Sequence, residues 1–411
     1  TYTFFKICDK VVPFLLLPII TRALEPQEFG MFILFQAIAG VVLPFMTLSV
    51  DSSILLNYFK VKPIDFKEYF SSGYFLLLIS SLVVSLGIYA TRVPIARLTE
   101  FPSQWVIVTT LFCFFQFHSN LALNMFQVRR EPQKYGIYSL SLTITKNLLM
   151  LLLIFVFGMK WEGMILGYLG GHALFSALGL LLFKKDKLFS KNIRRDFLVD
   201  NMKVGYPLSL HQMGAWAASS ATRVVVAGLL GSAATGSFGV GAAFGMVVLF
   251  VQDSFNKAFT PYLFEKLNDF NDTKESQMIK LTYIYNICLL SFATLMGLCG
   301  YLFIDVLFGH MYSAGKVVVF FMSLAYAFEG MYKMHVNYIF YTKKTHLILL
   351  ITMTSGALNI ILSYYFIKFY GLMGASLSLF VINVCCYLLA WYIGNHVFPM
   401  RWFQFKVSMA K

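Results

Sequence analysis

Charged residues are scarce in this sequence. Asp, Glu, Lys and Arg make up 13% of the 411 residues, about half of the roughly 25% that is typical of soluble domains. Hydrophobic residues make up 58% of the chain, the mean hydropathy is +0.71, and apolar runs of about 20 residues recur along it. These values exclude a soluble enzyme and predict an all-α integral membrane protein with many spans.

Cysteine is also rare, and its placement excludes a disulfide framework. The six cysteines all lie inside apolar segments, and none has metal-ligand spacing with a histidine. We interpret them as small hydrophobic residues, and we expect neither a metal nor a cofactor. No cleavable signal pattern is visible, and because the chain begins at Thr1 we expect a few residues to precede it.

Apolar length and flanking charge predict twelve transmembrane helices. We expect them at residues 4–20, 29–50, 70–90, 104–125, 136–157, 162–183, 204–230, 236–257, 279–304, 316–340, 346–367 and 372–397.

The cations are concentrated in alternate loops. They gather at 60–67, 129–134, 184–203, 257–280, 343–344 and 401–411, and are few in the intervening loops. The positive-inside rule therefore predicts that both termini are cytoplasmic. Because topology accounts for the net charge of +14, we expect no nucleic-acid partner. The opposite loops are short, which leaves no room for an extracytoplasmic catalytic domain.

A cytoplasmic linker divides the chain near its midpoint. Residues 184–203, KKDKLFSKNIRRDFLVDNMK, place Ile193, Phe197 and Met202 on one helical face, with basic residues elsewhere. This pattern predicts an interfacial amphipathic helix on anionic lipid. We therefore expect an N-terminal lobe at 1–183 and a C-terminal lobe at 204–411.

The two halves are weakly similar to each other. LEPQEFGMF (24–32) corresponds to LGSAATGSF (230–238), with Gly30 aligned to Gly236. NMFQVRREPQKY (124–135) corresponds in the same order to NYIFYTKKTHLI (337–348), and the segment after Asn147 to the segment after Asn359. Six helices in each half start and end on the same side, so we expect two pseudo-symmetric six-helix lobes related by an axis along the membrane normal. Alternating access between the lobes is the mechanism typical of this arrangement.

The same segments resemble the polysaccharide transporter family of the multidrug/oligosaccharidyl-lipid/polysaccharide exporter superfamily. The resemblance rests on TRALEPQEFGMF (21–32), LSVDSSILLNYF (48–59), VGYPLSL (204–210), ATRVVVAGLLGSAATGSFGV (221–240), YTKKT (341–345) and YGLMGASLS (370–378). It covers nearly the whole chain in order. It implies a flippase of the bacterial inner membrane, not an enzyme, that translocates undecaprenyl-pyrophosphate-linked oligosaccharides such as O-antigen units. Similar proteins often carry an acid just before the arginine of the seventh helix, where this chain has Thr222.

Four cations within the expected helices are candidate substrate-binding residues: Arg223, Lys146, Lys333 and Lys10. An arginine at a helix centre costs about 2.5–3.5 kcal/mol on insertion scales, so such residues usually face an interior or a cavity. Arg223 and Lys146 have no acid one helical turn away, which makes them the strongest candidates for a cationic cavity. The alternative is that an acid on another helix neutralises each of them.

The other two cations have acids nearby in the sequence. Glu329 precedes Lys333 by four residues, a favourable order for a helical ion pair, and Lys10 follows Asp9. Three acids are candidates for ion coupling: Asp51, Asp253 and Glu329. Each could instead cap a helix or pair with a cation.

Polar residues at helical spacing suggest a path for a glycan. Candidates on the fourth and seventh helices are Gln116, Asn120, Asn124, Gln212 and Trp216. Hydrogen bonding between helices is the alternative interpretation.

The expected partners are a lipid-linked oligosaccharide with an anionic pyrophosphate and the membrane lipids. A coupling proton or sodium ion and other polysaccharide-assembly proteins are further candidates. Two other functions stay open: a cation-coupled drug or organic-cation exporter of the same superfamily, and a membrane polymerase or ligase acting on the same lipid-linked glycan. Unpaired cations argue against the exporter, and the short outer loops argue against the enzyme.

Overall fold

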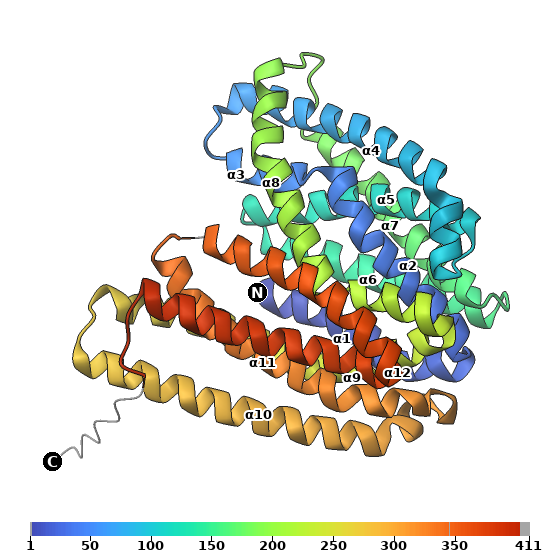
Figure 1. Cartoon of the computed structure of the whole chain (residues 1–411). Coiled ribbons are helices and arrows are strands. Elements are labelled where there is room, and N and C mark those ends of the chain that lie inside the picture. Colours follow the sequence, from blue (N-terminus) through green and yellow to red (C-terminus); the bar gives the residue numbers. More distant parts are fainter. Residues whose placement is uncertain (1, 345, 403–411) are drawn as a thin grey trace. The chain divides into compact units, whose positions relative to one another are not determined.

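The computed structural model describes residues 2–344 and 346–402, and within this range the regular secondary structure is helical (Figure 1). The chain divides into two compact units. The first lies within Thr1–Trp216 and Val226–Gly236, and the second within Ala217–Val225 and Ser237–Lys411. Residues 204–216, which the sequence analysis assigned to the C-terminal lobe, thus group with the first unit.

The first unit is built from eight helices and a segment of a ninth. Helix α6 packs on α7, α5 on α7, and α2 on α5. Proline at the first position of α2, α4 and α6 favours helix initiation there, because its missing N–H is not needed. The helices are α1 (Tyr2–Ala23), α2 (Pro26–Thr47), α3 (Val50–Asn57), α4 (Pro63–Thr99), α5 (Ser103–Val128), α6 (Pro132–Phe155), α7 (Trp161–Lys185) and α8 (Arg195–Ser219).

The remaining helices are longer and belong mostly to the second unit, and two of them are interrupted. α9 (Ala221–Asn268) is broken at Gly231, which has φ 83°, and α12 (His346–Val397) is broken at Gly371, which has φ 56°. These values lie in a region that glycine adopts readily. Between them lie α10 (Asp272–Phe308), the short helix η1 (His310–Gly315) and α11 (Lys316–Tyr341). At about 1.5 Å per residue, α12 is far longer than the roughly 30 Å membrane core, so its two halves make two spans.

Nine of the twelve expected spans fall within described helices, the span 29–50 runs past the end of α2 at Thr47, and the span 136–157 runs past the end of α6 at Phe155. Nine of the described helices are long and apolar enough to cross a membrane, including the interrupted α9 and α12. The break at Gly371 confirms the boundary expected between 367 and 372. The seventh span is wrong in one detail: it is not continuous over 204–230, because α8 ends at Ser219 and α9 begins at Ala221.

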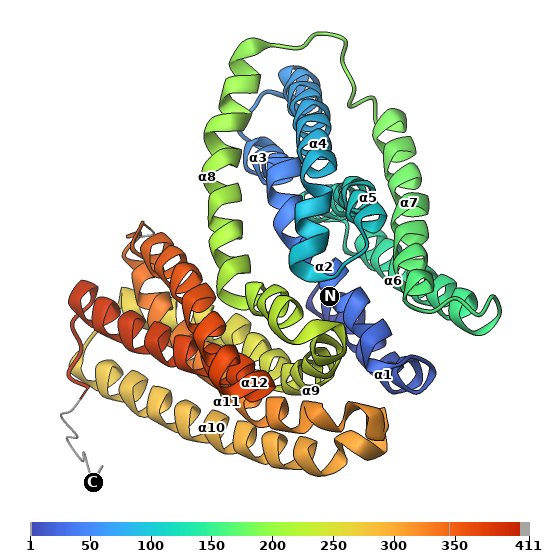
Figure 2. The same ribbon diagram turned by 45° about the vertical axis from the view of Figure 1, so that its right-hand side comes forward.

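The expected amphipathic helix at 184–203 is not one continuous helix, because only its ends, 184–185 in α7 and 195–203 in α8, are helical. Helix α7 ends at Lys185 and α8 begins at Arg195, so the segment between them is a loop (Figure 2). Serines of α4 hold this loop: the Ser190 amide donates to Ser71 Oγ (2.7 Å) and the Arg194 amide to Ser72 Oγ (3.1 Å). These distant acceptors satisfy backbone groups that a helix would otherwise pair internally.

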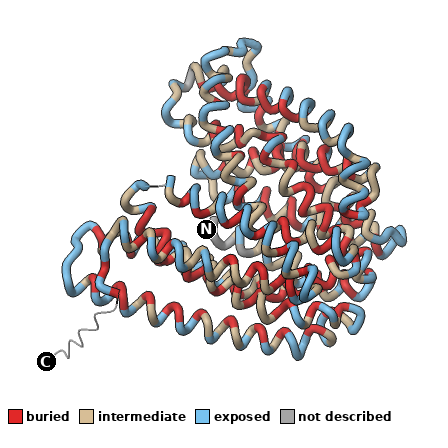
Figure 3. The backbone as a smooth tube through the Cα atoms, viewed as in Figure 1, coloured by how far each residue is buried: buried red, intermediate tan, exposed pale blue. Residues whose placement is uncertain are grey.

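Buried residues follow the inward faces of the helices in each unit (Figure 3). The core of the first unit is rich in aromatic residues, among them Tyr69, Phe70 and Phe183. Met278, Met331 and Tyr338 belong to the core of the second unit. Outward-facing leucines are widespread, as expected for helices surrounded by lipid.

Candidate functional site

Arg223 lies in the first turn of α9, directly after the helix break at Ser220. Its guanidinium Nη1 donates to Ser220 Oγ at 3.0 Å, and its charge acts electrostatically on the Tyr326 hydroxyl. No carboxylate of its own unit, among the described residues, forms an ion pair with it. A helix N-terminus carries positive partial charge and normally attracts acids. A half-buried arginine in this turn therefore creates a site that favours an anion.

A buried polar network fixes the break beside Arg223. The Asn359 side-chain amide donates to the Ala217 carbonyl (2.8 Å) and to Thr222 Oγ1 (3.1 Å), and the Thr222 hydroxyl lies 2.9 Å from Ser363 Oγ. Asn359 thus satisfies a carbonyl near the end of α8. Thr222 belongs to this neutral network. Arg223 therefore follows a neutral residue, and its own described hydrogen bond is to Ser220.

Lys146 on α6 has an aromatic neighbour in place of an ion pair. Its Nζ lies 5.0 Å from the centroid of the Tyr168 ring, within cation–π range. Asp9 and His172 interact with it electrostatically. The Asp9 carboxylate, however, accepts hydrogen bonds from Ser139 and, at 2.9 Å, from Thr143. The ammonium of Lys146 makes no hydrogen bond or ion pair with any described residue.

Lys333 is bound by two acids. Its Nζ lies 2.7 Å from Asp253 Oδ1 on α9 and 2.9 Å from Glu329 Oε1 on its own helix α11. The expected pair with Glu329 is present, and Asp253 joins it from a second helix. This cluster carries two negative charges and one positive charge, so Lys333 is less available to an anionic substrate than Arg223. The cluster also brings together two of the three candidate coupling acids.

Replacing Lys333 with methionine is expected to destabilise the second unit. Asp253 and Glu329 would lose the cation that they share, at a cost of about 1–3 kcal/mol for partly buried charges. Thermal unfolding of detergent-purified protein should show a midpoint several degrees lower. Adding Glu329→Gln should recover part of this loss, whereas Lys280→Met, at an exposed lysine of α10, should leave the midpoint unchanged. Equal midpoints for Lys333→Met and Lys280→Met would contradict a structural role for the cluster.

The remaining charged candidates lie in the first unit. Lys10 is exposed on α1, next to Asp9. Asp51, in the first turn of α3, accepts a hydrogen bond from the Asn124 side chain of α5 at 3.1 Å. Asn124, a candidate for the glycan path, is therefore a partner of Asp51.

The two candidates on α8 hydrogen-bond to other parts of the first unit. Gln212 Nε2 donates to Ser49 Oγ (3.1 Å), and Trp216 Nε1 donates to the Ala37 carbonyl (2.9 Å). Gln116 and Asn120 are half-buried on α5, and their side chains make no hydrogen bonds with described residues. These two amides are the polar groups of the expected path that are free to contact a ligand.

Sequence reasoning missed the residues that surround the two main cations. Tyr168 and His172 are four residues apart on α7, a spacing that places them on one helix face, but nothing local links them to Lys146. Tyr326 precedes Glu329 by three residues on α11, and Asn359 was noticed only through the repeat. Their proximity to the cations depends on contacts between helices.

Two solved transporters share this fold. The lipid II flippase MurJ, in an inward closed conformation, matches with a TM-score of 0.77 and 13% identity, over 95% of this chain and 87% of that one. An inward-facing multidrug resistance MATE family transporter of the MOP superfamily matches with a TM-score of 0.62 and 17% identity, over 96% and 94% of the two chains. The fold is therefore that of this class of multi-pass membrane transporters, as the sequence predicted.

The sequence matches the model of the polysaccharide biosynthesis protein family over residues 1–266, and the chain belongs to this family. This result confirms the resemblance found in the sequence. A protein of the Lsg locus of Haemophilus influenzae is 22% identical over 266 residues, which are 64% of each chain. The chain thus spans somewhat less than two thirds of the length of that relative.

Proposed function

We propose that this protein is a flippase for lipid-linked oligosaccharides. It moves an undecaprenyl-pyrophosphate-linked oligosaccharide, such as an O-antigen repeat unit, from the cytoplasmic to the periplasmic leaflet by alternating access. A charged and hydroxyl-rich head group cannot cross hydrocarbon without compensation for its lost hydration. The polysaccharide biosynthesis family and the transporter fold both support this task.

The observation that carries the proposal is Arg223 without an acidic partner in its own unit, at the start of a helix. A pyrophosphate presents several anionic oxygens, and a guanidinium can bind two of them at once. In the first unit, Lys146 is a further cation whose ammonium makes no ion pair among the described residues. A cavity that binds organic cations needs negatively charged residues. This contrast favours a lipid pyrophosphate over a drug as the substrate.

The energy source in this proposal is a proton or a sodium ion. Asp253 and Glu329 share Lys333, so binding of a small cation to either acid would compete directly with the lysine. Such competition can link ion binding to helix movement. Asp51, which is hydrogen-bonded to Asn124, is the corresponding candidate in the first unit.

The proposed location is the bacterial inner membrane, with both termini in the cytoplasm. The orientation rests on the concentration of lysine and arginine in alternate loops. In this orientation the basic end of α7 and the start of α8 lie at the cytoplasmic surface.

Purified protein in liposomes tests the function. We expect it to move a radiolabelled undecaprenyl-pyrophosphate-linked oligosaccharide between leaflets, measured as access of the glycan to a membrane-impermeant glycosidase. A matched glycan on neutral polyprenol should move much more slowly, because it lacks the charge that the cations bind. Transport of an organic cation without movement of either glycolipid would overturn the proposal. Elongation of the glycan, in place of its movement, would indicate an enzyme.

A further inference from the structure

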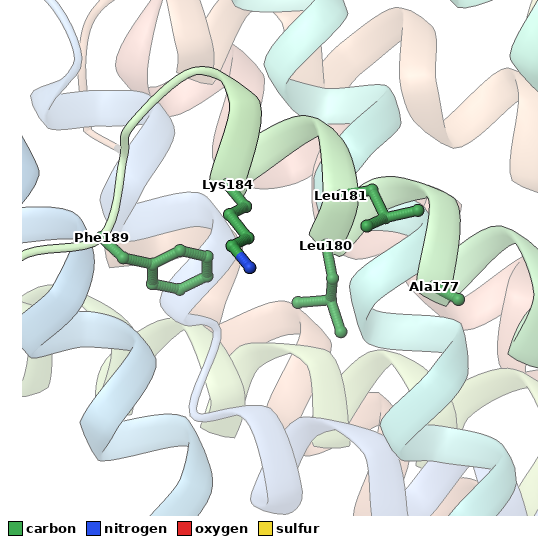
Figure 4. A pocket seen from close by; sticks show the side chains of 5 residues that line it. All are labelled: Ala177, Leu180, Leu181, Lys184 and Phe189. Carbon is green, nitrogen blue, oxygen red and sulfur yellow. The ribbon is translucent and has the colours of Figure 1, made fainter.

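Two neighbouring lysines at the end of α7 line two different surface hollows. Lys184 lines the first, of about 570 Å³, together with Ala177, Leu180, Leu181 and Phe189 (Figure 4). We call it the α7 hollow. Lys185 lines the second, also of about 570 Å³, which lies among α5, α6 and α7.

The α7 hollow has a preformed apolar wall. Ala177, Leu180, Leu181 and Lys184 recur at helical spacing on one face of α7. Phe189 comes from the loop after α7, and its ring makes edge contacts with Phe70 and Tyr74 at centroid distances of 5.6 and 5.2 Å. The same loop is tied down beside Phe189, where the Ser190 amide donates to Ser71 Oγ (2.7 Å).

Charge distinguishes the two hollows. Lys184 is the charged residue of the α7 hollow, it is exposed, and it has no ion pair with a described residue. In the second hollow, the carboxylate of Asp186 pairs with Arg129, and Glu131 Oε1 lies 2.8 Å from Lys134 Nζ. One oxygen of Glu131 is buried there without a partner. Lys184 therefore offers an anion a cation with no acid beside it in the α7 hollow, whereas Arg129 and Lys134 in the second hollow are already paired with acids.

We propose that the α7 hollow binds an anionic phospholipid of the surrounding bilayer. The head-group phosphate lies at Lys184, and an acyl chain lies along Leu180, Leu181 and Phe189. The side chain of lysine has a long aliphatic stem that packs on apolar surface while its charged end reaches the head groups. Basic pockets beside transmembrane helices suit anionic lipids. Lys184 does not belong to the candidate glycolipid site, so this inference does not depend on the proposed function.

Native mass spectrometry of the purified full chain in detergent tests the proposal. We expect phosphatidylglycerol to bind more tightly than phosphatidylcholine of the same acyl chains. Lys184→Gln should weaken phosphatidylglycerol binding about five-fold, the value expected for one lysine near an anionic surface, and Lys184→Arg should retain most of it. The matched control is Lys187→Gln, which removes the same charge three residues away, outside the hollow, and should leave binding unchanged.

Three outcomes would overturn the proposal. Equal binding of the two phospholipids would show that charge is not recognised. An equal loss in Lys184→Gln and Lys187→Gln would indicate diffuse attraction to a basic surface. The third outcome is that stoichiometric undecaprenyl phosphate displaces phosphatidylglycerol from the wild-type protein but not from Lys184→Gln. This result would assign the hollow to the substrate lipid.

Discussion

Arg223→Ala is expected to reduce glycolipid flipping by ten- to a hundred-fold while the protein still folds and inserts. Alanine removes the guanidinium that we place on the pyrophosphate, and charge-assisted hydrogen bonds of this kind contribute about 1.5–3 kcal/mol. The side chain's described hydrogen bond is to Ser220 in the preceding turn, so its removal breaks no ion pair within the second unit. The impermeant-glycosidase assay in proteoliposomes measures the rate.

The control for this variant is Arg97→Ala, which removes an exposed arginine of α4. It should leave both flipping and the unfolding midpoint unchanged, and Arg223→Lys should keep part of the activity. Lys146→Ala should also lower the rate, with partial recovery in Lys146→Arg, because the cation–π contact with Tyr168 accepts either cation. Normal flipping in Arg223→Ala would remove the anion-site hypothesis. A matching loss in Arg97→Ala would point to net charge as the cause.

The spans could be predicted because apolar length is a local property of the sequence. The same holds for the break near Gly371, where a turn was expected between two apolar runs. Residues 186–194 of the expected linker helix form a loop instead, and its backbone bonds to Ser71 and Ser72 of α4, more than a hundred residues away. The basic and apolar residues of this segment do recur at helical spacing. However, the backbone amides of Ser190 and Arg194 donate to these distant serines and not to carbonyls of a local helix.

The candidate site shows the same division between local and distant contacts. Glu329 was recognisable as a partner of Lys333 because the two are one helical turn apart. Asp253 was not, since 80 residues separate it from the lysine that it binds. Lys146 and Arg223 were found because a charge in an apolar run is conspicuous, whereas Tyr168 and Tyr326 are ordinary residues in their own helices. A sequence thus reveals which charges need explanation more readily than it reveals what surrounds them.

Gly30→Ala and Gly236→Ala are each expected to destabilise the first unit severely. A Cβ at Gly30 would overlap the Ser232 carbonyl and lie 2.9 Å from the Gly236 amide nitrogen. A Cβ at Gly236 would overlap the Pro26 carbonyl and lie 3.0 Å from the Gly30 nitrogen. Backbone cannot rotate away as a side chain does, so the two segments must separate, at a cost of about 1–3 kcal/mol or more. The unfolding midpoint of each variant should fall by several degrees. Gly87→Ala, which meets nothing within 4 Å, should not lower it.

The reciprocity of this contact makes the double variant informative. Each glycine faces the other and the carbonyl four residues before the other, and these are the two glycines that the internal repeat aligns. Once the first alanine has separated the segments, the second has less contact left to disrupt. The loss in the double variant should therefore be smaller than the sum of the two single losses, as expected for residues that share one interface. If the loss of stability in the double variant equals the sum of the two single losses, the two glycines act independently. The alignment of Gly30 with Gly236 in the internal repeat would then lose its main structural support.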